Sequence, residues 1–224
     1  MKRLLVVLGA VCLVVLLLGA MHDLAPASVE LHAAVATNLT ASGVEHPVTA
    51  VLLNFRGYDT LLEIAVLLLA LIVILAIGMD ATISAEATVD VRPLVNPVLQ
   101  TLAKLVVPLM ILVAVYLLWA GSFRPGGAFQ AGAVLAAAAV LLHLAELLPS
   151  WQSPGVKLRL GLAGGFLIFL AVGAVSLMQG ALLEYPLEQA GALILLIESG
   201  LTVSLGLILA GLFLLLSRDD GETS

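Results

Sequence analysis

Residues 190–216 have the sequence AGALILLIESGLTVSLGLILAGLFLLL, an apolar run with one carboxylate, Glu198, inside it. This run exceeds the ~20 residues that a helix needs to cross a hydrocarbon core of ~30 Å. Similar runs recur along the chain, in which 62% of the residues are hydrophobic and only 11% are charged. Because Leu, Ala and Val run unbroken, without the alternation of barrel strands, the sequence predicts an all-α, polytopic membrane protein.

Six apolar runs are long enough to span a membrane, and we predict a transmembrane helix for each. They cover residues 4–21, 60–79, 101–120, 128–148, 160–178 and 190–216. With the N-terminus in the cytoplasm, Arg56 and Arg124 lie outside, and the basic residues on or near the inner side are Lys2, Arg3, Arg92, Lys104, Lys157, Arg159 and Arg218. This excess on one side fits the positive-inside rule. An alternative for residues 4–21 is a cleaved signal peptide, which would leave five spans.

A polar, proline-containing stretch divides the predicted spans into two groups. Pro93 and Pro97 disfavour helix in this stretch, which also carries several carboxylates. We therefore expect a fusion of two membrane modules with cytoplasmic connections. The expected parts are a two-span module (1–80), a linker (81–98), a four-span domain (99–217) and a cytoplasmic tail (218–224).

The first polar constellation, RGYDTLLE at residues 56–63, leads directly into the second span. Asp59 and Glu63 are four residues apart and share one helix face, and Asp59 also suits a helix N-terminus. Arg56 is close enough in sequence to pair with either carboxylate. Two interpretations stay open: an interfacial cap with a salt bridge, or a place where protons or a metal cation enter the membrane.

The second constellation, GSFRPGGAFQAG at residues 121–132, connects the third and fourth spans. Gly126 and Gly127 allow a tight turn behind Arg124, and Gln130 brings an amide into the start of an apolar helix. A phosphate-binding loop is excluded, because no Gly-Lys-Ser/Thr follows the glycines and no strand precedes them.

The remaining polar candidates lie within spans or near their ends. Glu198 is the strongest, since a carboxylate inside a span either exchanges protons or pairs at a subunit contact. Lys104 either reaches the headgroups or neutralises a partner's carboxylate. His143 and Glu146, three residues apart, are expected on one helix face, as a proton relay or as a solvated pair. We expect three glycines to mediate helix packing: Gly161, Gly164 and Gly165.

The two constellations and the residues around Glu198 also carry a family resemblance. Residues 95–217, with RPGGAFQAG at 124–132 and ESGLTV at 198–203, resemble the B subunit (MnhB/MrpB family) of multisubunit sodium/proton antiporters. Residues 46–79, with VTAVLLNFRGYDTLLE at 48–63, look like the small MbhE-type module of the same assemblies. The resemblance implies that Asp59, Glu63 and Glu198 serve ion passage or subunit contact.

The function implied by the resemblance is that of an accessory membrane subunit of a cation (Na⁺)/proton antiporter related to the complex I membrane arm. Its partners would be other subunits, the lipid bilayer, and Na⁺ and H⁺ as transported ions, with no nucleic acid. The expected location is a bacterial or archaeal cell membrane, with both termini cytoplasmic. The alternatives are a membrane subunit of a redox-driven complex, such as a membrane-bound hydrogenase, and a purely structural scaffold. We expect no enzyme activity, cofactor or metal site, because no nucleophile–base pair or ligand set is visible.

Overall fold

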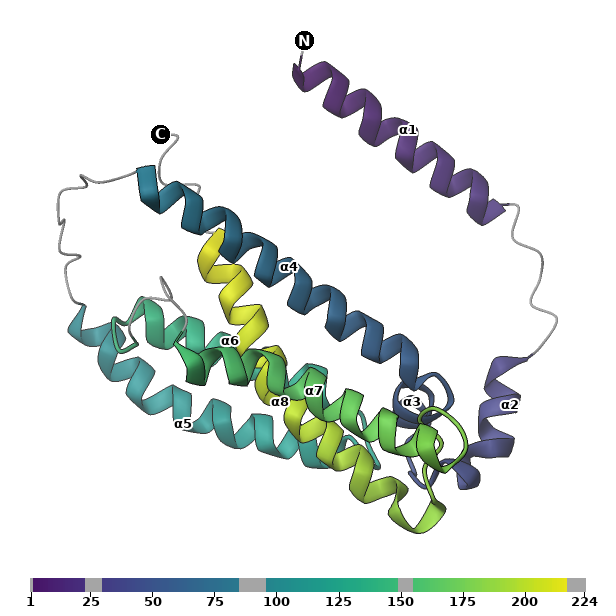
Figure 1. The fold of residues 1–224 in the computed structure, drawn as a ribbon. Helices are drawn as coiled ribbons and strands as arrows, with labels where there is room; N and C mark the ends of the chain where they lie inside the picture. Colours follow the sequence, from purple (N-terminus) through teal and green to yellow (C-terminus); the bar gives the residue numbers. More distant parts are fainter. Residues whose placement is uncertain (1, 23–29, 85–95, 149–154, 217–224) are drawn as a thin grey trace. The chain divides into compact units, whose positions relative to one another are not determined.

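The computed structural model of the chain describes residues 2–22, 30–84, 96–148 and 155–216. All regular structure in these ranges is helical (Figure 1). The elements are α1 (Lys2–His22), α2 (Leu31–Asn38), η1 (Leu39–Ser42), α3 (Pro47–Ala50), η2 (Val51–Phe55), α4 (Gly57–Ser84), α5 (Pro97–Ala120), α6 (Ala128–Leu144), α7 (Val156–Gln179) and α8 (Leu187–Leu216). The prediction of an all-α fold is confirmed.

Each of the six predicted spans coincides with one helix. The helices α4, α5, α7 and α8 contain stretches that are long and apolar enough to cross a membrane. The apolar stretches Val7–His22 of α1 and Ala128–Leu144 of α6 are shorter. The helix α6 ends at Leu144 rather than at residue 148, because Glu146 adopts a φ of 57° that an α-helix does not accommodate. The chain is therefore a multi-pass membrane protein.

The chain forms two compact units, of which the first ends at Ala34 and the second begins at Val35. In the first unit, the described side chains of α1 from Val7 onward are all exposed. The second unit contains α4 together with α5 to α8, and α8 contacts α4, α5, α6 and α7. Residues 85–95 and 217–224 lie outside the described residues, so the predicted linker and tail stay predictions.

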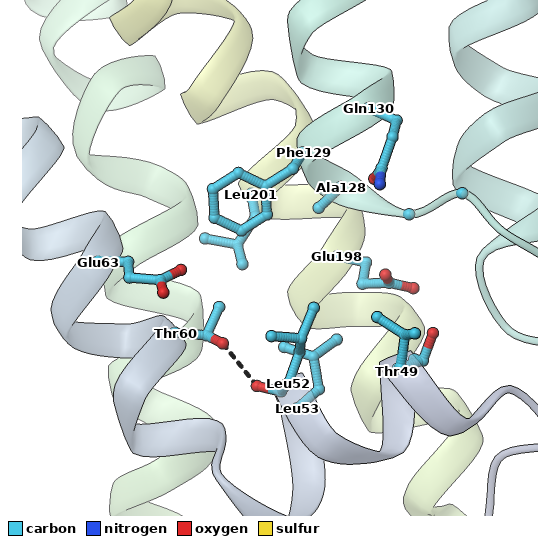
Figure 2. A pocket seen from close by; sticks show the side chains of 13 residues that line it. Thr49, Leu52, Leu53, Thr60, Glu63, Ala128, Phe129, Gln130, Glu198 and Leu201 are labelled. Carbon is cyan, nitrogen blue, oxygen red and sulfur yellow. Dashed lines mark hydrogen bonds between the residues drawn. The ribbon is translucent and has the colours of Figure 1, made fainter. Parts of the chain in front are cut away.

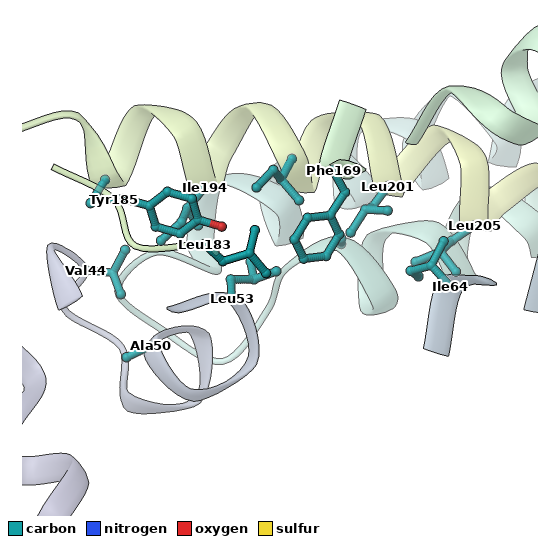
Figure 3. Packing of buried hydrophobic residues seen from close by; sticks show 13 residues of the cluster. Val44, Ala50, Leu53, Ile64, Phe169, Leu183, Tyr185, Ile194, Leu201 and Leu205 are labelled. Carbon is teal, nitrogen blue, oxygen red and sulfur yellow. The ribbon is translucent and has the colours of Figure 1, made fainter. Parts of the chain in front are cut away.

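The core of the second unit follows one face of α8 (Figure 3). The side chains of Ile194, Ile197, Leu201 and Leu205 have no solvent exposure, and their spacing of three and four residues is that of a helix face. Phe169 of α7 and Ile64 of α4 are equally buried in the same cluster. Glu198, which directly follows Ile197, is also buried.

Glycines bring α7 and α8 close together. A Cβ on Gly165 would lie 2.6 Å from the carbonyl oxygen of Gly200, and one on Gly161 would lie 2.6 Å from Leu207 Cδ1. Such contacts suit a membrane, where small residues let helix backbones approach each other. The packing prediction is thus confirmed for these two glycines, but it is wrong for Gly164, whose Cβ would meet nothing within 4 Å.

The connection between the first two predicted spans is largely helical from residue 31 onward. The short elements η1, α3 and η2 follow α2 in close succession and lead into α4. Pro47 stands at the first turn of α3, where its missing N–H costs no helical hydrogen bond. These elements build one wall of the site described next.

Candidate functional site

The chain around α3 docks onto the loop between α5 and α6. The hydroxyl of Thr49 donates a hydrogen bond to the carbonyl oxygen of Gly121 at 2.5 Å. The backbone N–H groups of Glu45 and His46 donate to the carbonyl oxygen of Ser122 at 3.3 and 3.1 Å. Because both acceptors are main-chain carbonyls, this joint depends on the backbone shape of the loop.

The element η2 is a π-helical turn. Within it, the N–H of Arg56 donates to the carbonyl oxygen of Val51, five residues earlier, at 2.8 Å. The hydroxyl of Thr60, in the first turn of α4, donates to the carbonyl oxygen of Leu52 at 2.6 Å. Such turns are rare and occur frequently at functional sites. Here the turn joins α3 to α4 without a flexible loop.

The two charged residues before Glu63 form an ion pair with each other. Arg56 pairs with Asp59, three residues on, as one of the sequence alternatives anticipated. The Arg56 side chain is 63% exposed, and ion pairs of this exposure contribute little to stability in solvent. Asp59 also lies in the first turn of α4, where a carboxylate is favoured by the helix dipole. Its position is that of a structural cap.

Three glycines allow the loop between α5 and α6 to fold tightly. The N–H of Gly127 donates to the carbonyl oxygen of Leu117 at 2.8 Å. A Cβ on Gly121 would lie 2.6 Å from Gly127 Cα, and one on Gly126 would collide with the Leu117 carbonyl oxygen. The tight turn predicted for this sequence is therefore confirmed, and it places the N-terminus of α6 beside α8.

Glu198 of α8 lies against that N-terminus. Its side chain is only 3% exposed, and the backbone N–H of Ala128 donates a hydrogen bond to its carboxylate. A Cβ on Gly127 would lie 2.7 Å from Glu198 Oε1, so only glycine leaves room for the carboxylate. Gly127 also has a φ of 107°, which side chains rarely tolerate. The other oxygen, Oε2, is buried and has no hydrogen-bond partner in the described structure.

Glu198 and Glu63 line one cavity of about 290 Å³ (Figure 2). The two carboxylates come from α8 and α4, and Figure 2 shows apolar side chains, among them Leu52 and Leu201, in the region between them. Glu63 is exposed on the isolated chain, whereas Glu198 is buried. No Lys, Arg or His is among the lining residues, which are Val48, Thr49, Leu52, Leu53, Thr60, Glu63, Gly126, Gly127, Ala128, Phe129, Gln130, Glu198 and Leu201.

The other predicted site residues divide into those that line this cavity, among them Gly126 and Gly127, and those that do not. Arg124 and Lys104 have exposed side chains and do not line it, although Gln130 does. His143 lies in the last turn of α6 with its Nδ1 buried and without a partner in the described structure. Glu146 lies beyond the end of α6, so it does not share a helix face with His143, contrary to the expectation from spacing.

Sequence reasoning did not identify Tyr185, which precedes α8. Its side chain is 6% exposed, its hydroxyl has no hydrogen-bond partner among the described residues, and burial raises the pKa of its phenol. The residue borders a second cavity of about 220 Å³ between α7 and the start of α8. No sequence pattern marks a single tyrosine in a connection as buried.

These features define the class of the protein as a polytopic α-helical membrane protein with a cavity lined by two carboxylates. A family profile described as "Domain related to MnhB subunit of Na+/H+ antiporter" matches residues 98–215. Because this match covers more than half of the chain, the chain belongs to that family. The matched range nearly coincides with the predicted four-span domain.

Two solved structures share the fold. One is a chain of the membrane-bound sulfane sulfur reductase, an archaeal respiratory membrane complex, with TM-score 0.68 and 22% identity, covering 96% of this chain and 97% of that chain. The other is a chain of the Mrp complex from Dietzia sp. DQ12-45-1b, with TM-score 0.68 and 20% identity. It aligns with 100% of this chain, which spans 27% of the Dietzia chain. No curated protein matches the chain.

Proposed function

We propose that the chain is an accessory, non-catalytic subunit of a multisubunit Na⁺/H⁺ antiporter. The observation that carries this proposal is its membership of the MnhB-related family. The fold shared with a chain of the Mrp complex supports it, as does the cavity with two carboxylates in a membrane-spanning bundle. The partners are then the other subunits of such a complex, and Na⁺ and H⁺ are the ions it exchanges.

Glu63 and Glu198 are the residues of this chain through which we propose that it serves ion passage. Both line the cavity, and acidic side chains in transmembrane segments mark ion and proton pathways. A scaffold that only joins neighbouring subunits is the alternative. In that case the carboxylates would serve only salt bridges and the cavity would have no transport role.

A second candidate function is a membrane subunit of a redox-driven complex. The fold shared with a chain of an archaeal respiratory membrane complex favours this version, since almost the full length of both chains is aligned. The described residues offer no group of three or more His, Cys, Asp or Glu side chains for a metal ion. We therefore assign any electron carrier of such a complex to another of its chains.

For the membrane topology, we propose that both termini lie in the cytoplasm of a bacterial or archaeal cell. The distribution of basic residues supports this orientation, since only Arg56 and Arg124 would then lie outside. In the same topology, residues 46–79 belong to an MbhE-like module fused to the MnhB-related domain. Accessibility of single cysteines to impermeant reagents on whole cells and on everted vesicles tests the orientation.

The test of the proposed function is Na⁺-dependent proton exchange in everted vesicles that contain the whole complex. Deletion of this chain is expected to abolish exchange, and expression of the wild-type chain is expected to restore it. A native gel shows in parallel whether the chain migrates with the complex. Exchange that persists without the chain, or a complex that never contains it, would refute the proposal. Proton pumping driven by an electron donor, without Na⁺-dependent exchange, would favour the redox version.

A further inference from the structure

The cavity between α4 and α8 contains two carboxylates and no basic side chain to balance them. Glu63 and Glu198 are its titratable lining residues. The titratable groups nearby, on the docked segment (residues 45–56) and in α4, do not line it; they include His46, Arg56 and Asp59. Carboxylates that share an apolar site disfavour the state in which both are ionised. The positive charge that would balance both carboxylates is not supplied by the lining of the cavity, and a proton is the smallest charge that can supply it.

One carboxylate oxygen of Glu198 is buried without a hydrogen-bond partner in the described structure. The Ala128 N–H, at the N-terminus of α6, donates to the carboxylate, and the helix dipole there favours negative charge. Oε2 has no hydrogen-bond partner in the described structure, and Glu198 is only 3% exposed, so bulk solvent does not supply one. A buried acceptor without a hydrogen bond is costly. Water in the cavity, or a proton on Oε2, removes that cost.

The cavity connects this buried oxygen to a more accessible acid. Its volume is about 290 Å³, and a water molecule occupies ~30 Å³ in the liquid, so several waters fit. Glu198 lies at the buried side, whereas Glu63 is exposed on the chain and lines the same space. Polar groups at both sides make the cavity suitable for water, unlike a purely apolar void.

We propose that Glu198 and Glu63 exchange a proton through water in this cavity, with Glu198 Oε2 as the inner proton-carrying atom. In the transfer, the O–H bond at Glu198 Oε2 breaks, the waters pass the proton along, and a new O–H bond forms on Glu63. One carboxylic acid and one carboxylate exist before and after the step, so charge and atoms balance. This inference rests on the proposed function, because the proton would enter or leave the antiporter's ion path here.

The lining favours a proton over a metal ion. Only two carboxylates line the cavity, one of them, Glu63, is exposed on the chain, and much of the remaining wall is apolar. A metal ion would need several fixed oxygen ligands around it, whereas a proton needs only a chain of waters between two acids. A bound Na⁺ is therefore the competing outcome of the test.

The first test is exchange by everted vesicles that carry the assembled complex with Glu198→Gln, Glu63→Gln, or both. Glutamine keeps the shape and the acceptor for Ala128 but carries no exchangeable acid proton. Each single substitution is expected to abolish exchange, and the double variant is expected to match the single ones. The control is Glu188→Gln, an exposed carboxylate in the first turn of the same helix, which is expected to exchange like wild type. Wild-type exchange in either single variant, with the complex intact on a native gel, would overturn the proposal.

The second test does not depend on transport and decides the matter if Glu198→Gln prevents assembly. Infrared difference spectra of the purified complex report protonated carboxyl groups, and the pH is stepped in H₂O and in D₂O. Glu63→Gln is expected to change the titration of a protonated carboxyl band that shifts in D₂O. If Glu63→Gln leaves the band unchanged, the proposed proton exchange is wrong. If the band responds to Na⁺ but not to pH, the cavity binds a metal ion rather than a proton. In both cases the chain would still be an antiporter subunit, so the two failures are distinguishable.

Discussion

The hydroxyl of Thr49 and the carbonyl oxygen of Gly121, 72 residues apart in sequence, are joined by a buried hydrogen bond of 2.5 Å. This bond connects the docked segment before α4 to the loop that begins α6. Both partners border the region where Glu198 meets the end of that loop. The loop whose end lies against Glu198 is therefore tied to the segment that precedes α4.

Thr49→Val is expected to destabilise the protein by about 1–3 kcal/mol, because it leaves the buried Gly121 carbonyl oxygen without its donor. The control is Thr101→Val, since Thr101 is exposed and donates only within its own helix, to Pro97. The temperature of half-inactivation of the purified complex measures both. Equal temperatures for the two variants would contradict a structural role for the Thr49 bond.

Gly127→Ala is expected to abolish exchange, because its Cβ would lie 2.7 Å from Glu198 Oε1 and its φ of 107° is strained for alanine. Gly155→Ala is the matched control, since a Cβ there meets nothing within 4 Å and φ is −64°. Exchange in vesicles and assembly on a native gel are compared. Wild-type exchange in Gly127→Ala would show that the close approach of the loop to Glu198 is dispensable.

Adjacent glycines of α7 offer an internal comparison. Gly165→Ala is expected to lower stability by about 1–3 kcal/mol, because its Cβ would lie 2.6 Å from the Gly200 carbonyl oxygen and force α7 and α8 apart. Gly164→Ala, which meets nothing within 4 Å, is expected to stabilise α7 by up to about 1 kcal/mol through helix propensity. Thermal unfolding of the two variants in the same detergent checks the sign of each effect. The same sign for both would argue against this helix contact.

Tyr185→Phe is expected to leave stability at neutral pH unchanged or raised, since it removes a buried hydroxyl that has no partner in the described structure. Burial raises the phenol pKa above the ordinary value of 10.0. The neutral phenol therefore favours the folded state below pH 10, and this contribution is lost as the pH rises above 10. Thermal stability of the wild type is expected to fall more steeply above that pH than that of Tyr185→Phe. Tyr58→Phe, at an exposed position, serves as the control.

The sequence was sufficient to locate the helices, because each predicted span is an apolar run whose length matches a bilayer. It was less informative where polar residues decide the structure. The segment before α4 was treated as a connection, yet it folds into short helices whose π-turn is fixed by the Thr60 hydrogen bond to Leu52. The predicted end of α6 was too late, because nothing in the sequence marks Glu146 as left-handed.

The candidate site was predictable only as separate pieces. Glu63 and Glu198 were each singled out because a carboxylate in an apolar run needs a partner or water. Their common cavity depends on the packing of α4 against α8, a long-range contact without a local signal. The Arg56 and Asp59 pair was predictable because it is formed within one turn. Lys104 and His143 carried similar local signals and have no place in the cavity.

The contact between residues 45–49 and the loop from α5 to α6 is made mostly of main-chain atoms, with the carbonyl oxygens of Gly121 and Ser122 as acceptors. The side chain at Ser122 can therefore vary among homologues without loss of these hydrogen bonds. Glycine is required at positions 121, 126 and 127, because a side chain there would collide with its neighbours. We expect homologues with little residue identity to retain this geometry. The spacing of the three glycines should therefore identify distant relatives better than overall sequence similarity does.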